Sequence, residues 1–115
     1  MNQLDPEVQS ELDAVRRDFE SRIGTMITDI ADTWEKTQLS NDPVVGMKRV
    51  GELAHSLAGN AGIFGQRQIS GAATDLEVAI DGRLAATDDF ESHRIKISRL
   101  LSDLQNKFAE MDAGS

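Results

Sequence analysis

The spacing of apolar residues constrains the fold of this chain more than any other feature. In its first third, apolar residues recur every three or four positions, at Leu4, Val8, Leu12, Val15, Phe19, Ile23, Met26, Ile30 and Trp34. Because an α-helix has 3.6 residues per turn, this spacing places them on one face of a single long helix. Asp5 and Pro6 precede most of the run as a capping residue and a proline at the first helical position. The sequence therefore predicts a helix from Pro6 to about Thr37.

Three shorter segments repeat this helical pattern, with helix-breaking residues between them. The breaks lie at Ser40–Pro43, at Gly62–Gly65 and within residues 82–89. We expect helices at about residues 6–37, 43–61, 66–81 and 89–111. Four amphipathic helices joined by short loops are typical of an antiparallel, up-and-down four-helix bundle. The sequence predicts one all-α domain over residues 1–115, with the apolar faces and Trp34 in its core.

The charge and composition of the chain limit its partners. It has 12 Lys and Arg against 20 Asp and Glu, a formal net charge of −8. Since nucleic acids and anionic membranes bind cationic patches, neither is expected as the main partner. No apolar run approaches the roughly 20 residues of a membrane span, and the first residues lack a signal-peptide pattern. The absence of cysteine excludes disulfides and thiol chemistry and fits a cytoplasmic protein, for which we expect a monomer.

The second predicted helix carries a histidine among glycines. On a helical wheel, His55 lies roughly 130° from the inward-facing residues, which predicts an exposed imidazole. Its neighbours on that face are Lys48, Gly51, Glu52, Gly59 and Gly62. A glycine inside a helix costs about 0.8–1 kcal/mol relative to alanine, and a solvent face offers no structural reason for one. The missing side chains leave the imidazole, a nucleophile near pH 7, open to a partner backbone or a phosphoryl group. An ordinary surface histidine with incidental glycines is the alternative.

The histidines do not predict a metal site. His93 is the only other histidine, and it lies in a different predicted helix. With no cysteine available as a ligand, we expect no bound metal.

The segment that begins at His55 resembles the signature of a known protein family. Residues 55–65 read HSLAGNAGIFG, which is similar to the pattern His-x-Leu-Lys-Gly-Ser-Ser-x-x-Phe/Leu-Gly of histidine-containing phosphotransfer (HPt) domains. The matching residues are His55, Leu57, Gly59, Asn60, Ala61, Phe64 and Gly65. The predicted four-helix pattern and the chain length agree with such a domain.

The resemblance implies an intermediate of a two-component phosphorelay. HPt domains accept a phosphoryl group on histidine Nε2 from a receiver-domain aspartate or a histidine kinase, which includes hybrid kinases. They pass it to another response-regulator receiver domain. By this resemblance, His55 carries the phosphoryl group and Gly59 leaves room for it. The receiver supplies Mg²⁺, so the chain itself is expected to need no cofactor and to have no enzymatic turnover.

Two further positions take their meaning from the resemblance. In the family, a Gln or Glu about 22 residues after the histidine often hydrogen-bonds its Nδ1, and Glu77 holds that position. A carboxylate there would fix the tautomer and leave Nε2 as the nucleophile, whereas a solvated surface glutamate is the alternative. The chain departs from the family at Ala58, where a lysine near the phosphoryl oxygens is usual. Lys48 and Arg67 are the candidates to replace that lysine.

The expected receiver-docking surface is the His55 face of the second and third helices. It comprises Lys48, Gly51, Glu52, Ser56, Gly59, Gly62, Ile63, Phe64 and Arg67. Of these, Phe64 is expected to pack into the end of the bundle instead. Two other functions stay open: a non-phosphorylated helical adaptor that binds a receiver or histidine kinase, and an unrelated bundle whose motif is coincidental. The missing lysine keeps the adaptor open.

Overall fold

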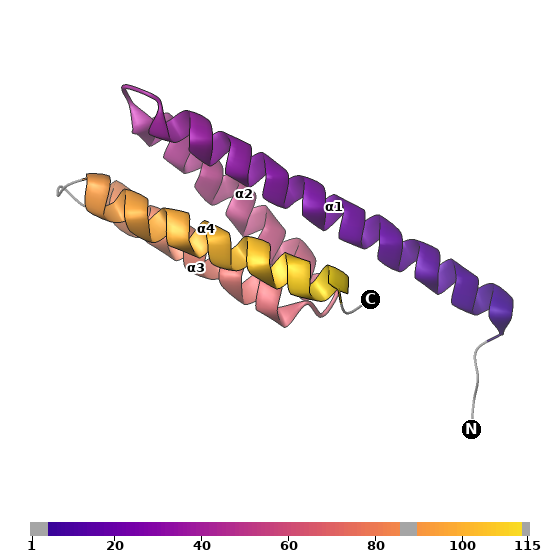
Figure 1. Ribbon diagram of the computed structural model, residues 1–115. Coiled ribbons are helices and arrows are strands. Elements are labelled where there is room, and N and C mark those ends of the chain that lie inside the picture. The colour runs from indigo at the N-terminus through magenta and orange to yellow at the C-terminus, as the bar shows by residue number, and fades with distance from the viewer. Residues whose placement is uncertain (1–4, 86–89, 114–115) are drawn as a thin grey trace.

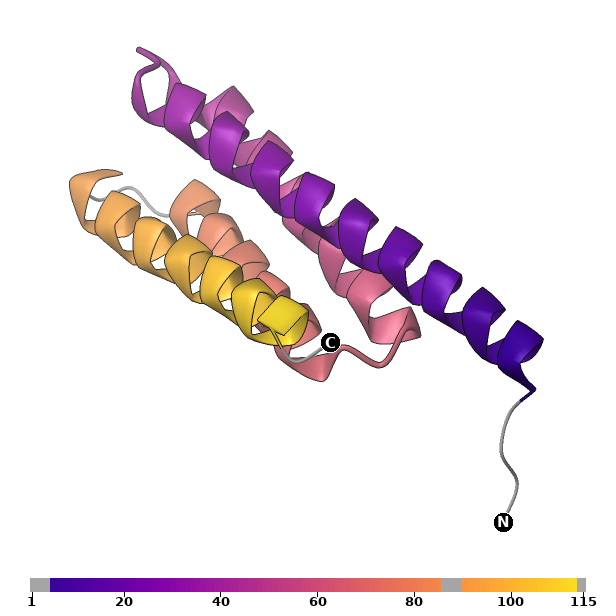
Figure 2. The same cartoon turned by 45° about the vertical axis from the view of Figure 1, so that its right-hand side comes forward.

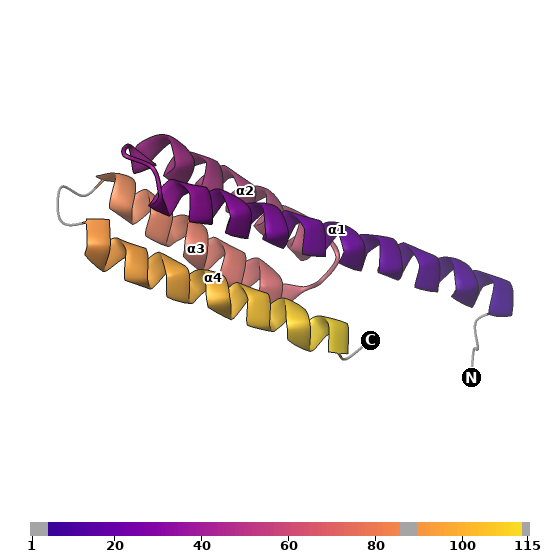
Figure 3. The ribbon, with the colours of Figure 1, turned by 45° about the horizontal axis from the view of Figure 1, so that its top comes forward.

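The chain folds into four antiparallel helices. A computed structural model describes residues 5–85 and 90–113. Its helices are α1 (Pro6–Gln38), α2 (Pro43–Ile63), α3 (Arg67–Ala85) and α4 (Phe90–Ala113). Consecutive helices pack side by side in opposite directions, and α4 also contacts α1, so the four surround a common core (Figures 1, 2 and 3). The predicted all-α four-helix bundle is confirmed.

An aspartate caps the start of each of the first two helices, as predicted for Asp5. An Asp5 carboxylate oxygen accepts a hydrogen bond from the Glu7 backbone nitrogen at 2.9 Å. Asp42 does the same for the Val44 backbone nitrogen at 3.2 Å. A proline follows each cap in the first turn, where its missing N–H has no partner to lose. These local signals explain why both helix starts were predictable.

α2 ends at a glycine turn, two residues later than predicted. Gly65 has φ of +75°, the left-handed conformation that glycine adopts without strain. In this turn the Gln66 nitrogen donates to the Ala61 carbonyl at 2.8 Å, and the Gly65 nitrogen donates to the Gly62 carbonyl at 3.1 Å. This pair of bonds is the Schellman motif, which satisfies the last carbonyls of the helix. The helix therefore extends to Ile63 rather than to Ala61.

The sequence predicts that the third helix ends at Asp81, but α3 continues beyond this residue. It begins at Arg67, passes through Gly82 and reaches Ala85. A glycine inside a helix costs about 1 kcal/mol, but the extra turn packs Leu84 against the core. Burial of a leucine contributes up to about 1.5–3 kcal/mol, which offsets the glycine. The predicted start of the fourth helix at residue 89 lies outside the described residues.

The apolar faces of all four helices meet in one core. Its buried members are Phe19, Ile23, Ile27, Ile30, Trp34, Met47, Val50, Ala54, Leu57, Ala61, Ile69, Ala73, Leu76, Ala79, Ile80, Ile97, Leu101 and Leu104. Trp34 is only 2% exposed, and its indole nitrogen donates to the Ser98 hydroxyl at 3.0 Å. Buried polar groups need such partners, so this bond lets the tryptophan sit in the core. Leu4, the first residue of the predicted stripe, lies outside the described residues.

The first three turns of α1 project beyond the bundle. Val8, Leu12 and Val15 are 42%, 46% and 54% exposed, so the prediction that they join the core is wrong. The 33 residues of α1 span about 50 Å, whereas the 21 residues of α2 span about 32 Å. Figure 1 shows α1 continuing past the ends of its neighbours. The bundle begins at Phe19, whose ring centroid lies 4.2 Å from the ring centroid of Phe64 at the end of α2.

A glycine sets the distance between α1 and α2 near their connection. A Cβ placed on Gly46 would lie 2.0 Å from the hydroxyl oxygen of Thr37. Thr37 is buried, and its hydroxyl donates to the Thr33 carbonyl at 2.6 Å. The two helices therefore approach each other at a distance that only glycine permits at position 46.

Candidate functional site

His55 lies on the outer surface of α2, in the middle of the bundle. Its side chain is 77% exposed, which confirms the orientation predicted from the helical wheel. The antiparallel packing of α2 and α3 brings Glu77 opposite it, although the two residues are 22 positions apart. The site is therefore built from two rigid, adjacent helices rather than from a loop.

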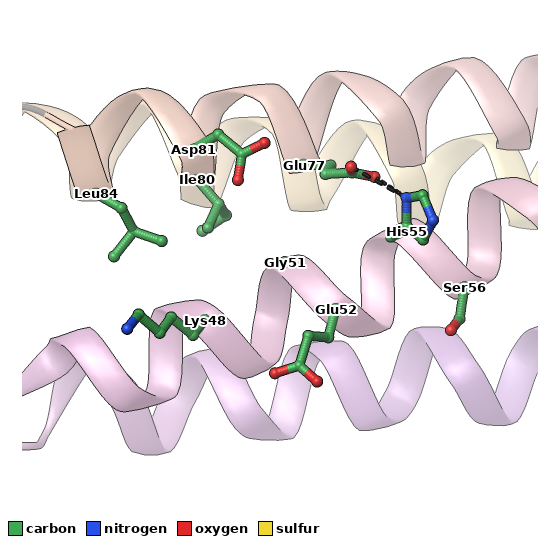
Figure 4. Close-up of a pocket in the computed structure, with 9 residues that line it drawn as sticks. All are labelled: Lys48, Gly51, Glu52, His55, Ser56, Glu77, Ile80, Asp81 and Leu84. Atoms are coloured by element: carbon green, nitrogen blue, oxygen red, sulfur yellow. Dashed lines mark hydrogen bonds and ion pairs between the residues drawn. The ribbon is translucent and has the colours of Figure 1, made fainter.

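The Glu77 carboxylate holds one nitrogen of the imidazole. Its two oxygens lie 3.0 and 3.1 Å from Nδ1 of His55, and the Glu77 side chain is 27% exposed. An ionised carboxylate only accepts hydrogen bonds, so Nδ1 carries the proton in this contact. In the neutral ring, Nε2 then keeps its lone pair. Figure 4 shows that this second nitrogen points away from Glu77. The arrangement leaves an exposed nucleophile with a set tautomer.

The two glycines nearest the histidine differ in environment. A Cβ on Gly59 would meet no heavy atom within 4 Å, so this position is open, as expected. Gly51 is buried, and a Cβ there would lie 3.2 Å from Cγ2 of Ile80. The prediction that Gly51 clears an exposed face is wrong, because this glycine lets α2 approach α3. Gly62 is exposed, and a Cβ placed on it would lie 3.5 Å from the Ser70 hydroxyl oxygen.

A shallow groove runs along α2 and α3 from the histidine. We call it the His55 groove; its volume is about 570 Å³, and it is lined by Lys48, Gly51, Glu52, His55, Ser56, Glu77, Ile80, Asp81 and Leu84 (Figure 4). The structure thus brings four predicted residues, Lys48, Gly51, Glu52 and Ser56, to the same surface as His55 and Glu77. Glu52 also lies 3.9 Å from Arg49, in a pair whose side chains are both more than half exposed.

Three residues of the groove were not predicted from the sequence, namely Ile80, Asp81 and Leu84. Asp81 and Leu84 follow Glu77 by four and seven residues, which puts them on the same face of α3. That spacing is the signal that would have found them once Glu77 was placed. Ile80 is fully buried at the base of the groove, where the backbone of Gly51 packs against its side chain.

Five residues of the predicted docking surface do not line the groove, namely Gly59, Gly62, Ile63, Phe64 and Arg67. Arg67 is ten residues before Glu77 on α3, about 15 Å along the helix axis. It lines the surface between α3 and α4 with Asp103 and Lys107, so the expectation that it lies near the histidine is wrong. Ile63 is 81% exposed at the end of α2 and does not line the groove.

The position that carries alanine instead of lysine faces the neighbouring helix. Ala58 is half-buried and packs against the core, and its carbonyl accepts a hydrogen bond from the Ser70 hydroxyl at 2.9 Å. Lys48 is the one cation among the described residues that line the groove. A phosphoryl group on Nε2 would therefore meet little positive charge from this chain.

Neither a metal-binding cluster nor a membrane-crossing helix is found in residues 5–85 and 90–113. No three His, Cys, Asp or Glu side chains in that part of the chain are grouped so as to hold a metal ion. None of the helices there is long and apolar enough to cross a bilayer.

Comparison with known proteins does not place the chain in a family. No family model matches it, and no curated protein or solved structure matches it either.

Proposed function

We propose that this protein is a phosphorelay intermediate that carries a phosphoryl group on Nε2 of His55. The observation that carries the proposal is the contact between Nδ1 and Glu77, which leaves an exposed Nε2 with its lone pair. The open space at Gly59, one turn away, supports it because a bulky partner needs access there. The HPt-like motif supplies the identity of the partner, a response-regulator receiver domain.

The reaction is a direct transfer between two side chains. The Nε2 lone pair attacks the phosphorus of the receiver's aspartyl phosphate, so the N–P bond forms as the acyl O–P bond breaks. The bonding electrons leave with the receiver's aspartate as a carboxylate. The imidazole becomes cationic, retains its Nδ1 proton and is stabilised by Glu77. The reverse steps return the phosphoryl group to a receiver.

The chain acts in this scheme as a carrier rather than as an enzyme. Mg²⁺ and the groups that neutralise the transferring phosphoryl belong to the receiver, and alignment of the two proteins provides the rest of the rate. A histidine kinase or hybrid kinase is the source of the phosphoryl group. We place the protein in the cytoplasm because these partners act there.

The proposal is tested by labelling. The protein is incubated with receiver domains that carry a ³²P-labelled phosphoryl group, or with an autophosphorylated histidine kinase. The expected product is acid-labile, alkali-stable phosphate, which disappears in His55→Gln and persists in the control His93→Gln. Absence of label on the wild-type protein from every donor would contradict the proposal.

Ala58 gives one alternative a specific basis. Without a lysine at this position, a non-phosphorylated adaptor that binds the same partners is the second candidate function. The labelling experiment separates the two, because an adaptor would bind a receiver and take no label. Binding is measured by calorimetry with the same receiver domains.

A further inference from the structure

The first three turns of α1 carry an apolar stripe that none of the described helices covers. It consists of Val8, Leu12 and Val15, which are 42%, 46% and 54% exposed. The stripe lies on the face of α1 that also carries Phe19, so it leads directly into the core of the bundle. At that junction Phe64 packs on Phe19 and is itself 44% exposed. The stripe and the end of the bundle therefore form one continuous apolar surface.

A second copy of α1 can lie along this stripe in one direction only. From Phe19 onward, α2 and α4 already cover the same face of α1. A copy of α1 laid parallel would have to continue into the space that α2 and α4 occupy. An antiparallel copy leads away from the bundle instead, and its first turn lies next to Phe64 at the end of α2. It then runs in the same direction as α2, so opposite ends of two helix dipoles meet (Figures 1 and 3).

The projecting segment is complementary to itself in length and position. Residues 6–18 span about 20 Å, and Leu12 lies at their centre. When two such segments overlap fully in antiparallel orientation, the two-fold axis passes beside Leu12. Val8 of each copy then lies beside Val15 of the other. Every residue of the stripe is covered and neither bundle collides with the other, as a contact between identical surfaces requires.

The charges along the segment favour the same orientation. The first turn is acidic through Asp5 and Glu7, whereas Arg16 and Arg17 lie at the other end of the segment. Neither arginine forms an ion pair with another residue that the structure describes. Antiparallel overlap places the arginines of one copy within about a turn of the acidic first turn of the other. Parallel overlap would place like charges side by side.

We propose that two copies of this protein associate through antiparallel contact of residues 6–18 of α1. The inference is independent of the proposed function. The contact is a strip about 20 Å long and about 10 Å wide. This is small beside the roughly 800 Å² that each partner buries in a standard interface, so we expect a dissociation constant on the order of 0.1 mM. In dilute solution the protein is therefore a monomer with a bare stripe.

Sedimentation equilibrium between about 10 μM and about 1 mM tests the proposal. The wild type is expected to pass from monomer to dimer over this range. Val15→Asp places a carboxylate in the apolar contact and should raise the dissociation constant roughly tenfold or more. Val78→Asp is the matched control, because Val78 is 63% exposed on α3 and lies outside the stripe. It should dimerise as the wild type does.

Two results of this experiment would overturn the proposal. One is equal dissociation constants for Val15→Asp and Val78→Asp, which would place any self-association elsewhere on the molecule. The other is a wild type that stays monomeric at the highest concentration, which would leave the stripe to a helix of a different protein.

Single cysteines report the direction of the two helices. The chain has no cysteine, so each introduced thiol is unique. Leu12→Cys lies beside the two-fold axis and is expected to form an intermolecular disulfide on mild oxidation, which requires Cα atoms within roughly 7 Å. Two copies of Val8→Cys lie roughly 12 Å apart along the antiparallel pair, so they should form a disulfide only when mixed with Val15→Cys. A disulfide from Val8→Cys alone, without one from Leu12→Cys, would contradict the antiparallel contact.

Discussion

At the scale of single residues, the contact between Glu77 and His55 determines which imidazole nitrogen is free. The carboxylate oxygens accept a hydrogen bond from Nδ1–H at 3.0–3.1 Å, so Nε2 keeps the exposed lone pair of the neutral ring. In the proposed mechanism, the same carboxylate stabilises the cationic ring of the phosphorylated form. Under that proposal, Glu77 is a positioning residue that acts through the histidine.

Removal of the Glu77 carboxylate is expected to slow phosphoryl transfer. A hydrogen bond to a charged group contributes about 1.5–3 kcal/mol, so Glu77→Ala should lower the transfer rate roughly tenfold to a hundredfold. Glu77→Gln keeps an acceptor for the Nδ1 proton and should lose less. Imidazole ¹⁵N shifts report the tautomer, and Glu77→Ala should populate the form protonated at Nε2. An unchanged tautomer and an unchanged rate would contradict the role of Glu77.

The glycine at position 59 is expected to lower the stability of the folded protein and to keep the histidine accessible. A side chain there meets no atom within 4 Å, so Gly59→Gln should stabilise the protein by about 0.5–1 kcal/mol through helix propensity. It should also slow transfer from a receiver, because the new side chain lies one turn from His55. Urea unfolding and transfer kinetics measure the two effects.

Gly71 supplies the matched control for Gly59. It is equally open and lies within α3, on the surface shared with α4. Gly71→Gln should therefore stabilise the protein by a similar amount and leave transfer unchanged. Equal transfer rates for the two variants would show that Gly59 has no part in access to the histidine.

At the scale of helices, close packing at glycine positions sets how the elements meet. Gly46 brings α2 against Thr37 of α1, and Gly51 brings α2 against Ile80 of α3. α2 is therefore the helix that contacts both neighbours most closely, and it also carries His55. The position of His55 relative to Glu77 depends on these approaches.

Gly46→Ala is expected to destabilise the bundle. The added Cβ would lie 2.0 Å from the Thr37 hydroxyl oxygen, so α1 and α2 have to move apart. Overpacking of this kind costs about 1–3 kcal/mol, more than the gain of about 0.8–1 kcal/mol in helix propensity. The midpoint of urea unfolding should fall for Gly46→Ala and rise for Gly71→Ala. A rise for both would show that the two helices separate without cost.

At the scale of the whole molecule, the bundle and the projecting part of α1 differ in stability. Residues 6–18 form the first part of α1, and the other described helices cover α1 only from Phe19 onward. Most helical stability in proteins comes from packing of an apolar face, and an isolated helix of about 12–15 residues is marginal in water. The projecting turns therefore depend on the packed part of the same helix.

Hydrogen exchange and two substitutions are expected to reveal this division. Amides of residues 10–16 should exchange faster than those of residues 23–34 in the same helix. Leu12→Ala should change the free energy of unfolding by less than about 0.5 kcal/mol, whereas Ile23→Ala should cost about 2–5 kcal/mol. Leu12 is 46% exposed and Ile23 is 1% exposed. A large effect of Leu12→Ala would mean that this stripe is covered in solution.

The helices were predictable because their signals are local. The caps Asp5 and Asp42 and the apolar spacing act within a few residues, and these determine where α1 and α2 begin. The exposed position of His55 follows from the same periodicity. The predicted end of the third helix before Gly82 was wrong because packing of Leu84 against the core outweighs the low helix propensity of glycine.

The sequence alone determined four amphipathic helices, their antiparallel order and an exposed histidine next to an open glycine, since each depends on neighbours along the chain. Only the tertiary structure decided which parts of those helices are covered. Val8, Leu12 and Val15 have the same spacing as the core residues, yet none of the described helices lies against them. Gly51 faces Ile80 rather than solvent, and Asp81 joins His55 in one groove. The spacing of apolar residues determines which face of a helix is apolar. The lengths and offsets of the neighbouring helices determine which parts of that face are covered.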